Sequence, residues 1–293
     1  MEIIKIESLS KYYGKARGVT DLSFSVDQGE FFGFIGPNGA GKSTTIRVLL
    51  GLIHGSYDKV EIFGKDIATH QQEILADVGF MSSEGMFYNG MKVKDIIRLS
   101  ADLRNKDCSV EAKRLCDILQ LDTSRKIEEL SLGNRKKVSI VCAMQHRPSL
   151  YIFDEPTSGL DPLIQHEFFT LLKERNKEGA TVFLSSHILS EVQRYCDKAA
   201  IIREGKIVAY DNVEKLTKTK VRKITLIGNV DIESLGGVSQ VKRLNGSMTF
   251  FYEGEIKNLL SVLGKADLKD LMINEPDLEE VFMHYYKKEG EIL

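Results

Sequence analysis

Polar and hydrophobic positions alternate in two stretches near the start of the chain, 3–7 and 22–26. A period of two residues is typical of a strand with one buried face, so both stretches predict half-buried antiparallel strands. Apolar segments that also predict strands follow at 30–35, 78–81 and 150–153. The last of these is the kind of run that a buried parallel strand needs.

Apolar residues spaced three and four apart lie between these strands and predict helices. The predicted helices of this part of the chain span residues 43–52, 67–77, 162–177 and 188–195, and the remaining short strands span 60–63, 181–184, 199–202 and 207–210. Strands separated by helices predict a parallel sheet with right-handed crossovers. The pattern therefore favours an α/β fold with an antiparallel β subdomain.

The segment from about 82 to 149 has helical periodicity and hardly any strand signal. Helices are predicted within it at 93–104, 109–120 and 133–146. We expect this segment to form a helical subdomain inserted in the α/β core.

A basic stretch at 216–221 ends the predicted first domain. We place the boundary after residue 217, so that the domains are residues 1–217 and 218–293. The second domain has predicted strands at 223–227, 238–244 and 248–252 and predicted helices at 255–264 and 278–288. This pattern predicts a small α+β accessory domain. At roughly 75 residues it is small for an independent unit, so we expect it to lean on another surface.

The composition is ordinary for a soluble globular protein, with 293 residues, 42% hydrophobic and 28% charged, and a formal net charge of −2. This near-neutral charge gives no electrostatic case for nucleic acid, which we do not expect as a partner. The four cysteines lie far apart, without C-x-x-C spacing, which argues against a zinc site and a disulfide framework. No apolar run approaches membrane-spanning length, so we expect a cytoplasmic chain unless a partner tethers it to a membrane.

The run from Gly33 to Thr45 carries the clearest chemistry. It contains Gly36-x-x-x-x-Gly41-Lys42-Ser43, the phosphate-binding P-loop pattern, between a predicted strand and a predicted helix. Glycines let the backbone bring N–H groups close to phosphate oxygens, and the helix start adds the positive end of its dipole. We expect Lys42 to bridge the outer phosphates and Ser43 to bind Mg²⁺. The loop residues predicted to bind nucleotide are Gly36, Asn38, Gly39, Gly41, Lys42, Ser43, Thr44 and Thr45.

Two carboxylates, Asp154 and Glu155, follow the apolar segment at 150–153. The carboxyl ends of strands in a parallel sheet are where ligands bind. Asp154 is predicted to hold Mg²⁺ through water, and Glu155 to polarise the attacking water. The alternative is a strand-end turn, since Asp-Glu-Pro-Thr is also good loop chemistry.

Ser131 and Gly133 lie at the start of the predicted helix at 133–146 and suit two interpretations. Ser131 is at a position typical of a helix cap. The same hydroxyl, with a bare backbone N–H at Gly133 and the helix dipole, could instead form a second anion site. The local pattern does not separate these interpretations.

The ordered set of motifs resembles the ATP-binding subunit of an ABC (ATP-binding cassette) transporter. Its members, which cover residues 36–187, are the P-loop, Leu130-Ser131-Leu132-Gly133-Asn134, Asp154-Glu155, Ser158-Gly159-Leu160-Asp161 and Ser185-Ser186-His187. The resemblance implies a P-loop NTPase fold of the ABC ATPase type. It also implies ATP and Mg²⁺ as cofactors, and ATP hydrolysis coupled to transport as the activity.

The resemblance further implies that two cassettes face each other head to tail, as a homodimer or a heterodimer. Each ATP then lies between the P-loop of one chain and the signature (residues 130–134) of the other. Ser131 and Gly133 would touch the γ-phosphate bound by the partner, and Asp161 would shape the dimer interface.

Other roles also come from the resemblance. Lys42 and Glu155 would serve catalysis together with His187, which would contact the γ-phosphate on the P-loop side. Tyr13 matches the aromatic residue on which such proteins stack adenine, with Tyr12 as the fallback.

The chain departs from the family pattern at three positions. Ser83 stands where the family usually has a glutamine that reaches Mg²⁺ and senses the membrane partner, and serine is too short for the same contact. We hypothesise that Ser83 acts on the metal through water or that Glu84 substitutes. An unchanged ATPase rate and unchanged transport after alanine substitution at both positions would rule out both proposals. Leu132 and Asn134 replace the commoner Gly and Gln of the signature.

Two further stretches bear on partners. The stretch 85–91 is apolar and glycine-punctuated, as partner surfaces commonly are, and in the family this region meets the multi-span membrane permease subunit. The alternative is a loop folded onto its own helices. The stretch 274–282 resembles the C-terminal end of cassettes that serve drug, antimicrobial-peptide and lantibiotic-immunity exporters, although a capped amphipathic helix also explains it.

The function that these observations predict is ATP hydrolysis that powers a membrane exporter, at the inner face of the cell membrane through the permease. ATP closes the dimer and hydrolysis opens it. One alternative is a soluble ABC-type ATPase without a membrane partner, and another is a non-hydrolysing module that senses ATP. A single cassette, with no sustained heptad pattern between Lys42 and Ser131, argues against the first alternative.

Overall fold

The computed structural model describes residues 1–85, 87–217, 221–230, 232, 235–244, 246–264 and 266–274. The chain divides into two compact units, Met1–Asp211 and Asn212–Leu293. This division falls a few residues before the domain boundary proposed after residue 217. The short helix α8 (Val213–Thr217) therefore lies on the side of the second unit.

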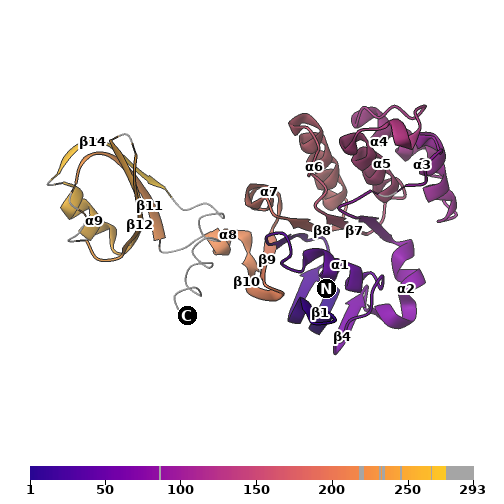
Figure 1. Ribbon diagram of the computed structural model, residues 1–293, viewed down its shortest axis with the longest axis horizontal. Coiled ribbons are helices and arrows are strands. Elements are labelled where there is room, and N and C mark those ends of the chain that lie inside the picture. The colour runs from indigo at the N-terminus through magenta and orange to yellow at the C-terminus, as the bar shows by residue number, and fades with distance from the viewer. Residues whose placement is uncertain are drawn as a thin grey trace. The chain divides into compact units, whose positions relative to one another are not determined.

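The first unit is built around a six-stranded sheet with the order β10-β9-β3-β8-β7-β6 (Figure 1). Its strands are β3 (Phe31–Ile35), β6 (Val78–Met81), β7 (Leu150–Asp154), β8 (Thr181–Ser186), β9 (Lys198–Arg203) and β10 (Lys206–Asn212). The pairs β3–β8, β3–β9, β7–β8 and β6–β7 are parallel, which confirms the predicted parallel sheet. Because parallel strands end at the same edge, the segments that follow β3, β6, β7 and β8 lie together.

A second sheet, with the order β2-β1-β4-β5, belongs to the same unit. Its strands are β1 (Glu2–Tyr13), β2 (Ala16–Asp27), β4 (Lys59–Ile62) and β5 (Lys65–Asp66). β1 pairs antiparallel with both β2 and β4, as the alternating pattern predicts. Ile4 and Ile6 of β1 are both buried and lie two residues apart, as expected where successive side chains of a strand point to opposite faces.

The two sheets share one hydrophobic core with helix α1 (Lys42–Leu49). Phe24 of β2 stacks on Phe32 of β3, with ring centroids 5.7 Å apart. Val48 of α1 is buried in the same cluster. Burial of its apolar side chains holds α1 against the sheets, and this positions the loop between β3 and α1.

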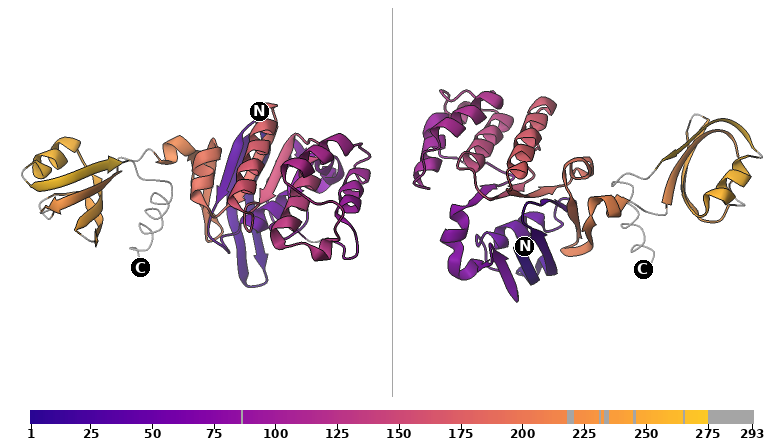
Figure 2. Two further views of the ribbon diagram at one scale, coloured as in Figure 1. Left: turned by 90° about the horizontal axis from the view of Figure 1, so that it is seen from above. Right: turned by 180° about the vertical axis from the view of Figure 1, so that it is seen from behind.

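Helices α6 (Pro162–Lys177) and α7 (Leu189–Tyr195) cover the opposite face of the parallel sheet (Figures 1 and 2). Phe168 of α6 makes an edge contact with Phe153 of β7, with ring centroids 5.3 Å apart. A Cβ added to Gly33 would lie 2.4 Å from Cγ1 of Val192 in α7. The close packing of α7 on β3 therefore depends on a residue without a side chain at position 33.

The segment between β6 and β7 is helical, as its periodicity predicts. It contains α3 (Val93–Asp102), α4 (Ser109–Ile118), the 3₁₀ turn η1 (Ile127–Glu129) and α5 (Leu132–Met144), while α2 (Ile67–Ala76) precedes β6. The helices α3, α4 and α5 lie side by side (Figures 1 and 2), and α5 also packs on β6. Most of α5 is buried, including Lys136 and Lys137. This helix therefore joins the helical segment to the parallel sheet.

The second unit contains a four-stranded sheet with the order β12-β13-β11-β14. Its elements are β11 (Val221–Asn229), β12 (Val238–Leu244), β13 (Ser247–Glu253), α9 (Ile256–Leu263) and β14 (Asp267–Asn274). Leu259 and Leu263 of α9 pack with Phe250 of β13 in a core of its own. β14 was not predicted from the sequence. The helix predicted at 278–288 lies outside the described residues.

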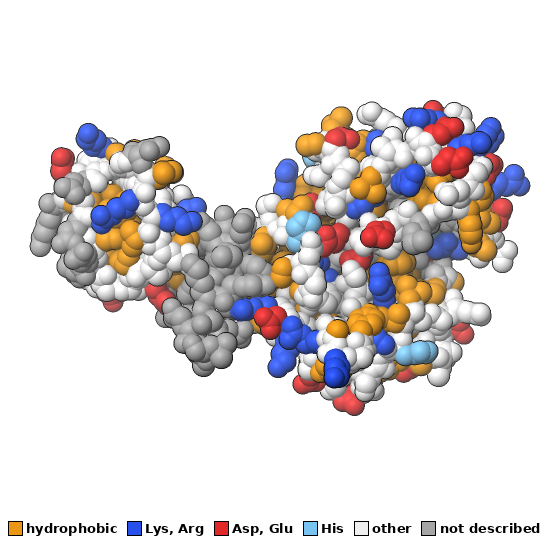
Figure 3. All heavy atoms as spheres, in the orientation of Figure 1, with side chains coloured by type: hydrophobic (Ala, Val, Ile, Leu, Met, Phe, Trp, Pro, Cys, Tyr) orange, Lys and Arg blue, Asp and Glu red, His pale blue; other side chains and the backbone are white. Residues whose placement is uncertain are grey.

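Acidic and basic side chains are interspersed over the visible face of the first unit (Figure 3). No helix among the described residues is long and apolar enough to cross a membrane.

Candidate active site

Two glycines allow the P-loop to join β3 to α1. Gly41 precedes α1 in a left-handed conformation (φ 110°), and a Cβ added there would lie 2.6 Å from Cγ1 of Val19. A Cβ on Gly36 would lie 2.4 Å from the carbonyl oxygen of Ile202. Neighbouring atoms therefore exclude a side chain at both positions, and at Gly41 the backbone conformation also disfavours one.

The amides at the start of α1 suit an anion. Thr45 is the first residue of α1 whose amide bonds back, to the carbonyl oxygen of Gly41 at 2.9 Å. The amides of Lys42, Ser43 and Thr44 precede it, and a helix leaves its first N–H groups without an intrahelical acceptor. Together with the helix dipole, such a helix start binds phosphate groups.

The side chains of the loop differ in what they can offer to a ligand. Thr45 is fully buried, and its hydroxyl donates to the carbonyl oxygen of Gly41 at 3.0 Å, so this side chain serves the helix. Of the other predicted loop residues, Ser43 and Thr44 are half-buried, and Asn38 and Gly39 are exposed.

Lys42 connects the P-loop to the end of β7. Its Nζ is buried and donates to the carbonyl oxygens of Gly36 at 2.6 Å and Pro37 at 3.1 Å. The same Nζ lies 2.9 Å from Oε1 of Glu155. The structure thus brings together two residues that lie far apart in the chain and that the sequence predicts for one site.

Glu155 is held on several sides. Its other carboxylate oxygen, Oε2, lies 2.7 Å from Nδ1 of His187. Its amide donates to the carbonyl oxygen of Ser185 at 3.1 Å and faces the Ser185 hydroxyl at 3.2 Å. Its backbone is left-handed (φ 50°), which is uncommon for a residue with a side chain. The turn after β7 therefore aims the Glu155 carboxylate at the P-loop lysine and at His187.

The charge state of Glu155 follows from these contacts. Burial raises the pKa of its carboxyl, but the hydrogen bonds and charges of Lys42 and His187 outweigh burial and hold the pKa below its ordinary value. Glu155 is therefore an ionised carboxylate at neutral pH, which is the form that can polarise a water molecule.

Asp154 and Ser43 offer oxygen atoms to a metal ion. The Asp154 side chain is 3% exposed, and the Ser185 hydroxyl donates to its Oδ1 at 2.6 Å. No group of three or more His, Cys, Asp or Glu residues suited to a metal occurs in the part of the chain that the structure describes. Mg²⁺ is usually bound through one or two protein oxygens together with phosphate oxygens, so a hydroxyl and a carboxylate fit this ion.

Tyr13 lies beside the P-loop helix. Its hydroxyl is 3.5 Å from Oγ1 of Thr44, its ring is half exposed, and Nζ of Lys11 lies 5.3 Å from the ring centroid. The Tyr12 hydroxyl instead lies 3.1 Å from Oγ1 of Thr20 on β2. This placement favours Tyr13 over Tyr12 as the ring available to a base.

The signature residues lie at the start of α5. Ser131 caps this helix, and its hydroxyl accepts a hydrogen bond from the amide of Asn134 at 3.3 Å. A Cβ added to Gly133 would lie 2.8 Å from the carbonyl oxygen of Gly159. The structure thus shows the helix cap, while the second anion site stays a prediction.

Asp161 is also a helix cap. Its carboxylate accepts a hydrogen bond from the amide of Ile164 at 3.0 Å at the start of α6. Within the described part of the chain, neither Ser131 nor Asp161 hydrogen-bonds to the P-loop. The structure therefore places these predicted residues outside the cluster formed by Lys42 and Glu155.

Ser83 follows β6, which pairs with β7, so it lies at the sheet edge where Asp154 ends its strand. The neighbouring Ser82 hydroxyl donates to the carbonyl oxygen of Glu84 at 2.6 Å, and Glu84 is exposed. The roles proposed for Ser83 and Glu84 stay predictions.

The predicted partner segment 85–91 is described except for Met86. A Cβ on Gly85 would lie 2.6 Å from the hydroxyl of Ser139, so this segment approaches α5. Tyr88 is 74% exposed, which leaves an aromatic ring open to a partner. Of the stretch 274–282, all but the first residue lies outside the described residues.

Comparison with known proteins agrees with this geometry. The family model described as ABC transporter matches residues 19–158. The bacitracin transport ATP-binding protein BcrA of Bacillus licheniformis is 38% identical over 223 residues, which cover 73% of this chain and 72% of that protein. The chain belongs to the ABC transporter ATP-binding protein family.

Other similarities extend this finding. The linearmycin resistance ATP-binding protein LnrL of Bacillus subtilis is 29% identical over 306 residues, covering 96% of this chain and 97% of that protein. A solved structure of an ATP-binding subunit of an ABC transporter superposes with a TM-score of 0.68 at 32% identity, over 74% of this chain and 92% of that one. The similarity to LnrL therefore includes the second unit, whereas the structural match covers about the extent of the first.

Two residues of this ATP-binding protein that contact the site were not singled out from the sequence. Lys136 lies in a basic run, Arg135-Lys136-Lys137, that suggests a solvated helix face, yet it is 2% exposed and its Nζ donates to the carbonyl oxygen of Glu155 at 2.7 Å. Ser185 precedes His187 and bonds to Asp154. The motif Ser185-Ser186-His187 could have pointed to Ser185 as a site residue. No sequence pattern pointed to Lys136.

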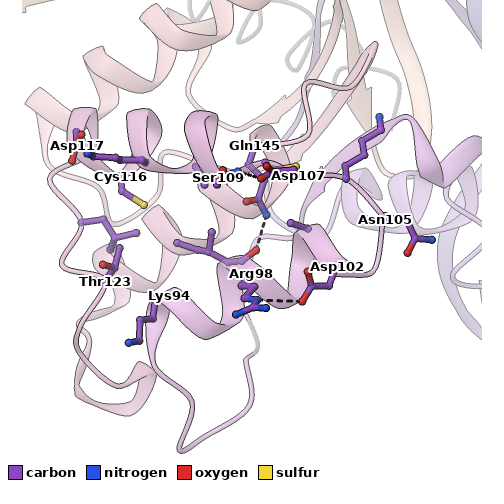
Figure 4. Close-up of a pocket in the computed structure, with 17 residues that line it drawn as sticks. Lys94, Arg98, Asp102, Asn105, Asp107, Ser109, Cys116, Asp117, Thr123 and Gln145 are labelled. Carbon is purple, nitrogen blue, oxygen red and sulfur yellow. Dashed lines mark hydrogen bonds and ion pairs between the residues drawn. The ribbon is translucent and has the colours of Figure 1, made fainter.

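A cavity of about 930 Å³ lies apart from these residues, in the helical segment (Figure 4). α3, α4 and the turn between them supply most of its lining, and Gln145 reaches it from the end of α5. Its wall contains an ion pair between Arg98 and Asp102, with 3.7 Å between nitrogen and oxygen. Because none of the predicted site residues lines this cavity, we place the site at the P-loop edge of the sheet.

Proposed function

We propose that this chain is the ATP-hydrolysing subunit of a membrane exporter. The observation that carries the proposal is the Glu155 carboxylate, which lies 2.9 Å from Nζ of Lys42 and 2.7 Å from Nδ1 of His187. A phosphate-binding loop and an ionised carboxylate therefore lie side by side at the carboxyl edge of a parallel sheet. Phosphoryl transfer to water needs this combination of anion binding and water activation.

The residues of the site have different roles in this proposal. The amides of the P-loop and Lys42 bind and orient the phosphates, and Ser43 and Asp154 would hold Mg²⁺. Bound Mg²⁺ would supply neutralisation of phosphate charge. Glu155 polarises the attacking water and accepts its proton, while His187 orients the Glu155 carboxylate.

The start of α5 is proposed to complete the site of a second chain. Ser131 and Leu132 are exposed there, and a helix start with free amides is suited to a phosphate group. In this proposal ATP binding closes a dimer, as a homodimer or a heterodimer, and hydrolysis opens it. Asp161 then lies at the interface.

The transport partner is proposed from the relatives. Two of them are named for bacitracin transport and for linearmycin resistance, so we propose a drug or antimicrobial compound as cargo and a multi-span permease as partner. We assign segment 85–91, in which the ring of Tyr88 is exposed, as the surface that contacts the permease. The chain would then lie at the inner face of the cell membrane.

Substitution Glu155→Gln tests the proposal. An amide cannot accept the proton, so we expect the steady-state ATPase rate to fall by about 10²–10⁴-fold. ATP with Mg²⁺ should also trap a long-lived dimer that size-exclusion chromatography resolves. Glu167→Gln, on α6, is the matched control and should behave like the wild type. If the rate of the Glu155 variant were unchanged, the assignment of the base would be wrong, and without a trapped dimer the closing step would be wrong.

The alternatives are separated by two measurements. A wild-type protein that binds ATP without Mg²⁺-dependent hydrolysis would be a sensing module. Purification from membranes together with a multi-span protein supports the exporter, whereas recovery with ribosomes or DNA would support a soluble ATPase.

A further inference from the structure

Lys136 links the signature helix to the turn that carries Glu155. It lies just over one turn beyond Ser131 on α5, it is 2% exposed, and its Nζ donates to the main-chain carbonyl oxygen of Glu155 at 2.7 Å. The two residues come from different parts of the first unit, because Glu155 follows β7 and Lys136 belongs to the helical segment. The contact is therefore a tertiary one, made where α5 meets the sheet.

The main chain of Glu155 is hydrogen-bonded through both its amide and its carbonyl group. On one side its amide donates to Ser185 of β8, and on the other its carbonyl oxygen accepts from Lys136. Its left-handed φ of 50° is maintained against an intrinsic preference for other conformations. Displacement of Lys136 would therefore move or release the residue whose carboxylate faces Lys42 and His187.

The surroundings of Lys136 act on its charge in two directions. Burial lowers the pKa of its ammonium below the ordinary value, and the carboxylates of Glu155, Asp154 and Glu191 offset part of that effect. A hydrogen bond from a cation to a buried carbonyl is stronger than one between neutral groups. Lys136 is thus held among the acids of the site.

We propose that Lys136 is a positioning residue that couples the two nucleotide sites of a dimer, by transmitting displacement of the α5 start to Glu155 of the same chain. This inference rests on the proposed function, in which Ser131 and Gly133 touch the nucleotide bound by the partner. The start of α5 then responds to the partner's site, while Lys136 holds the carboxylate that serves this chain's own P-loop.

The physical basis of the coupling is the helix itself. Ser131 and Lys136 belong to one continuous, mostly buried helix, so a shift of its start carries the lysine with it. A coupling free energy between two sites is reciprocal for binding, and in the proposed function ATP closes the dimer, so each nucleotide should raise the affinity of the other site. The ATPase rate should consequently rise cooperatively with ATP concentration in the wild-type protein.

The test is Lys136→Met in the full chain, since methionine keeps the apolar stem and removes the ammonium group. We expect kcat to fall about tenfold, the loss expected for one charge-assisted hydrogen bond. The Hill coefficient for ATP should fall to about 1, as separate sites require, while the affinity of the single chain for a fluorescent ATP analogue, measured at protein concentrations too low for a dimer, stays within about twofold. The last two readouts distinguish coupling from general damage.

The neighbouring Lys137→Met is the matched control. Lys137 is also on α5 and 9% exposed, and its side chain makes no hydrogen bond or ion pair within the residues that the structure describes. It should keep the wild-type kcat and Hill coefficient. Lys136→Gln, which lacks the charge and the reach, serves as a second variant if the methionine variant does not fold, and thermal unfolding of each protein checks this.

The outcomes are distinguishable. An unchanged Hill coefficient in the Lys136 variants, or a wild-type value of 1, overturns the coupling and leaves the proposed ATPase standing. A wild-type protein with no Mg²⁺-dependent ATPase activity overturns the proposed function and this inference with it. A fall of kcat and of the Hill coefficient only at Lys136 supports the proposal.

Discussion

The P-loop edge of the sheet and the start of α5 differ in how far contacts within one chain hold their residues in place. At the P-loop edge Lys42 and Asp154 are buried, and each is bonded to residues from other elements. At the start of α5, Ser131 is exposed and bonds to an amide of its own helix, and Leu132 is 62% exposed. The first region is preorganised by tertiary contacts, whereas the second is a helix start presented to solvent. A surface of the second kind can be completed by another molecule.

The largest effect is expected at the preorganised region. Lys42→Ala removes the ammonium group that faces Glu155 and the predicted phosphates, so we expect kcat/KM for ATP to fall by about 10²–10³-fold. Lys177→Ala, at an exposed position at the end of α6, is the control and should change the rate by less than about twofold. ATPase assays measure both. A small effect at Lys42 would mean that the P-loop edge is not the reacting site, and the comparison would fail.

A smaller and different effect is expected at the start of α5. In Gly133→Ala the added methyl group would meet the carbonyl oxygen of Gly159, which lies 2.8 Å from the Cβ position. We expect ATP-dependent dimer formation to weaken by about tenfold, equivalent to about 1.4 kcal/mol, while ATP binding to the single chain is retained. Gly236→Ala, at a position with open space around it, is the matched control.

Analytical ultracentrifugation and binding of a fluorescent ATP analogue separate the two readouts for Gly133→Ala. Equal loss of ATP binding and of dimer formation would show that the start of α5 is not a separate half of the site. A lower melting temperature alone would show that position 133 matters for packing only.

Substitution of Tyr13 tests whether the P-loop region extends to the ring that stacks on the base. We expect Tyr13→Ala to weaken ATP binding by roughly fivefold to tenfold, because stacking of a base on an aromatic ring contributes about 1–3 kcal/mol and the ring is half exposed. Tyr12→Ala should change affinity less, and Tyr13→Phe should keep it. Isothermal titration calorimetry measures all three. A larger loss at Tyr12 would reassign the base-stacking ring.

The smallest effect concerns pH. The pKa of Glu155 lies below its ordinary value of 4.5, so its ionised form stabilises the fold above that pH and the contribution is lost as pH falls through the lowered pKa. The difference in unfolding free energy between the wild type and Glu155→Gln should shrink as the pH falls below about 4.5. Urea unfolding at several pH values measures it. A difference that grows on acidification would contradict the assigned direction.

Local patterns predicted much of the fold. Alternation predicted β1 and β2, and helical spacing predicted α6 with its observed bounds, because these signals arise from burial of one face of a single element. β14 was missed because this strand is mostly exposed, with Lys269 and Asp270 on its surface, so it lacks a clear buried face.

Some residues of the candidate site could likewise be predicted from the sequence, and others could not. The P-loop was predictable because its chemistry lies in consecutive residues whose glycines have a local backbone role. Lys136 was not, since a lysine in a basic run is usually solvated. Its burial depends on the approach of α5 to the end of β7, which brings the Glu155 carbonyl oxygen within 2.7 Å.

The order of motifs along the chain determined by itself the family, the nucleotide-binding loop and the two acids after β7. Only the tertiary structure decided which of these residues touch. Parallel strands end at one edge, so Lys42, Glu155 and His187 meet although they are distant in sequence. The same packing leaves the start of α5 exposed while it buries Lys136, because a helix that crosses from surface to sheet edge has one end in each environment.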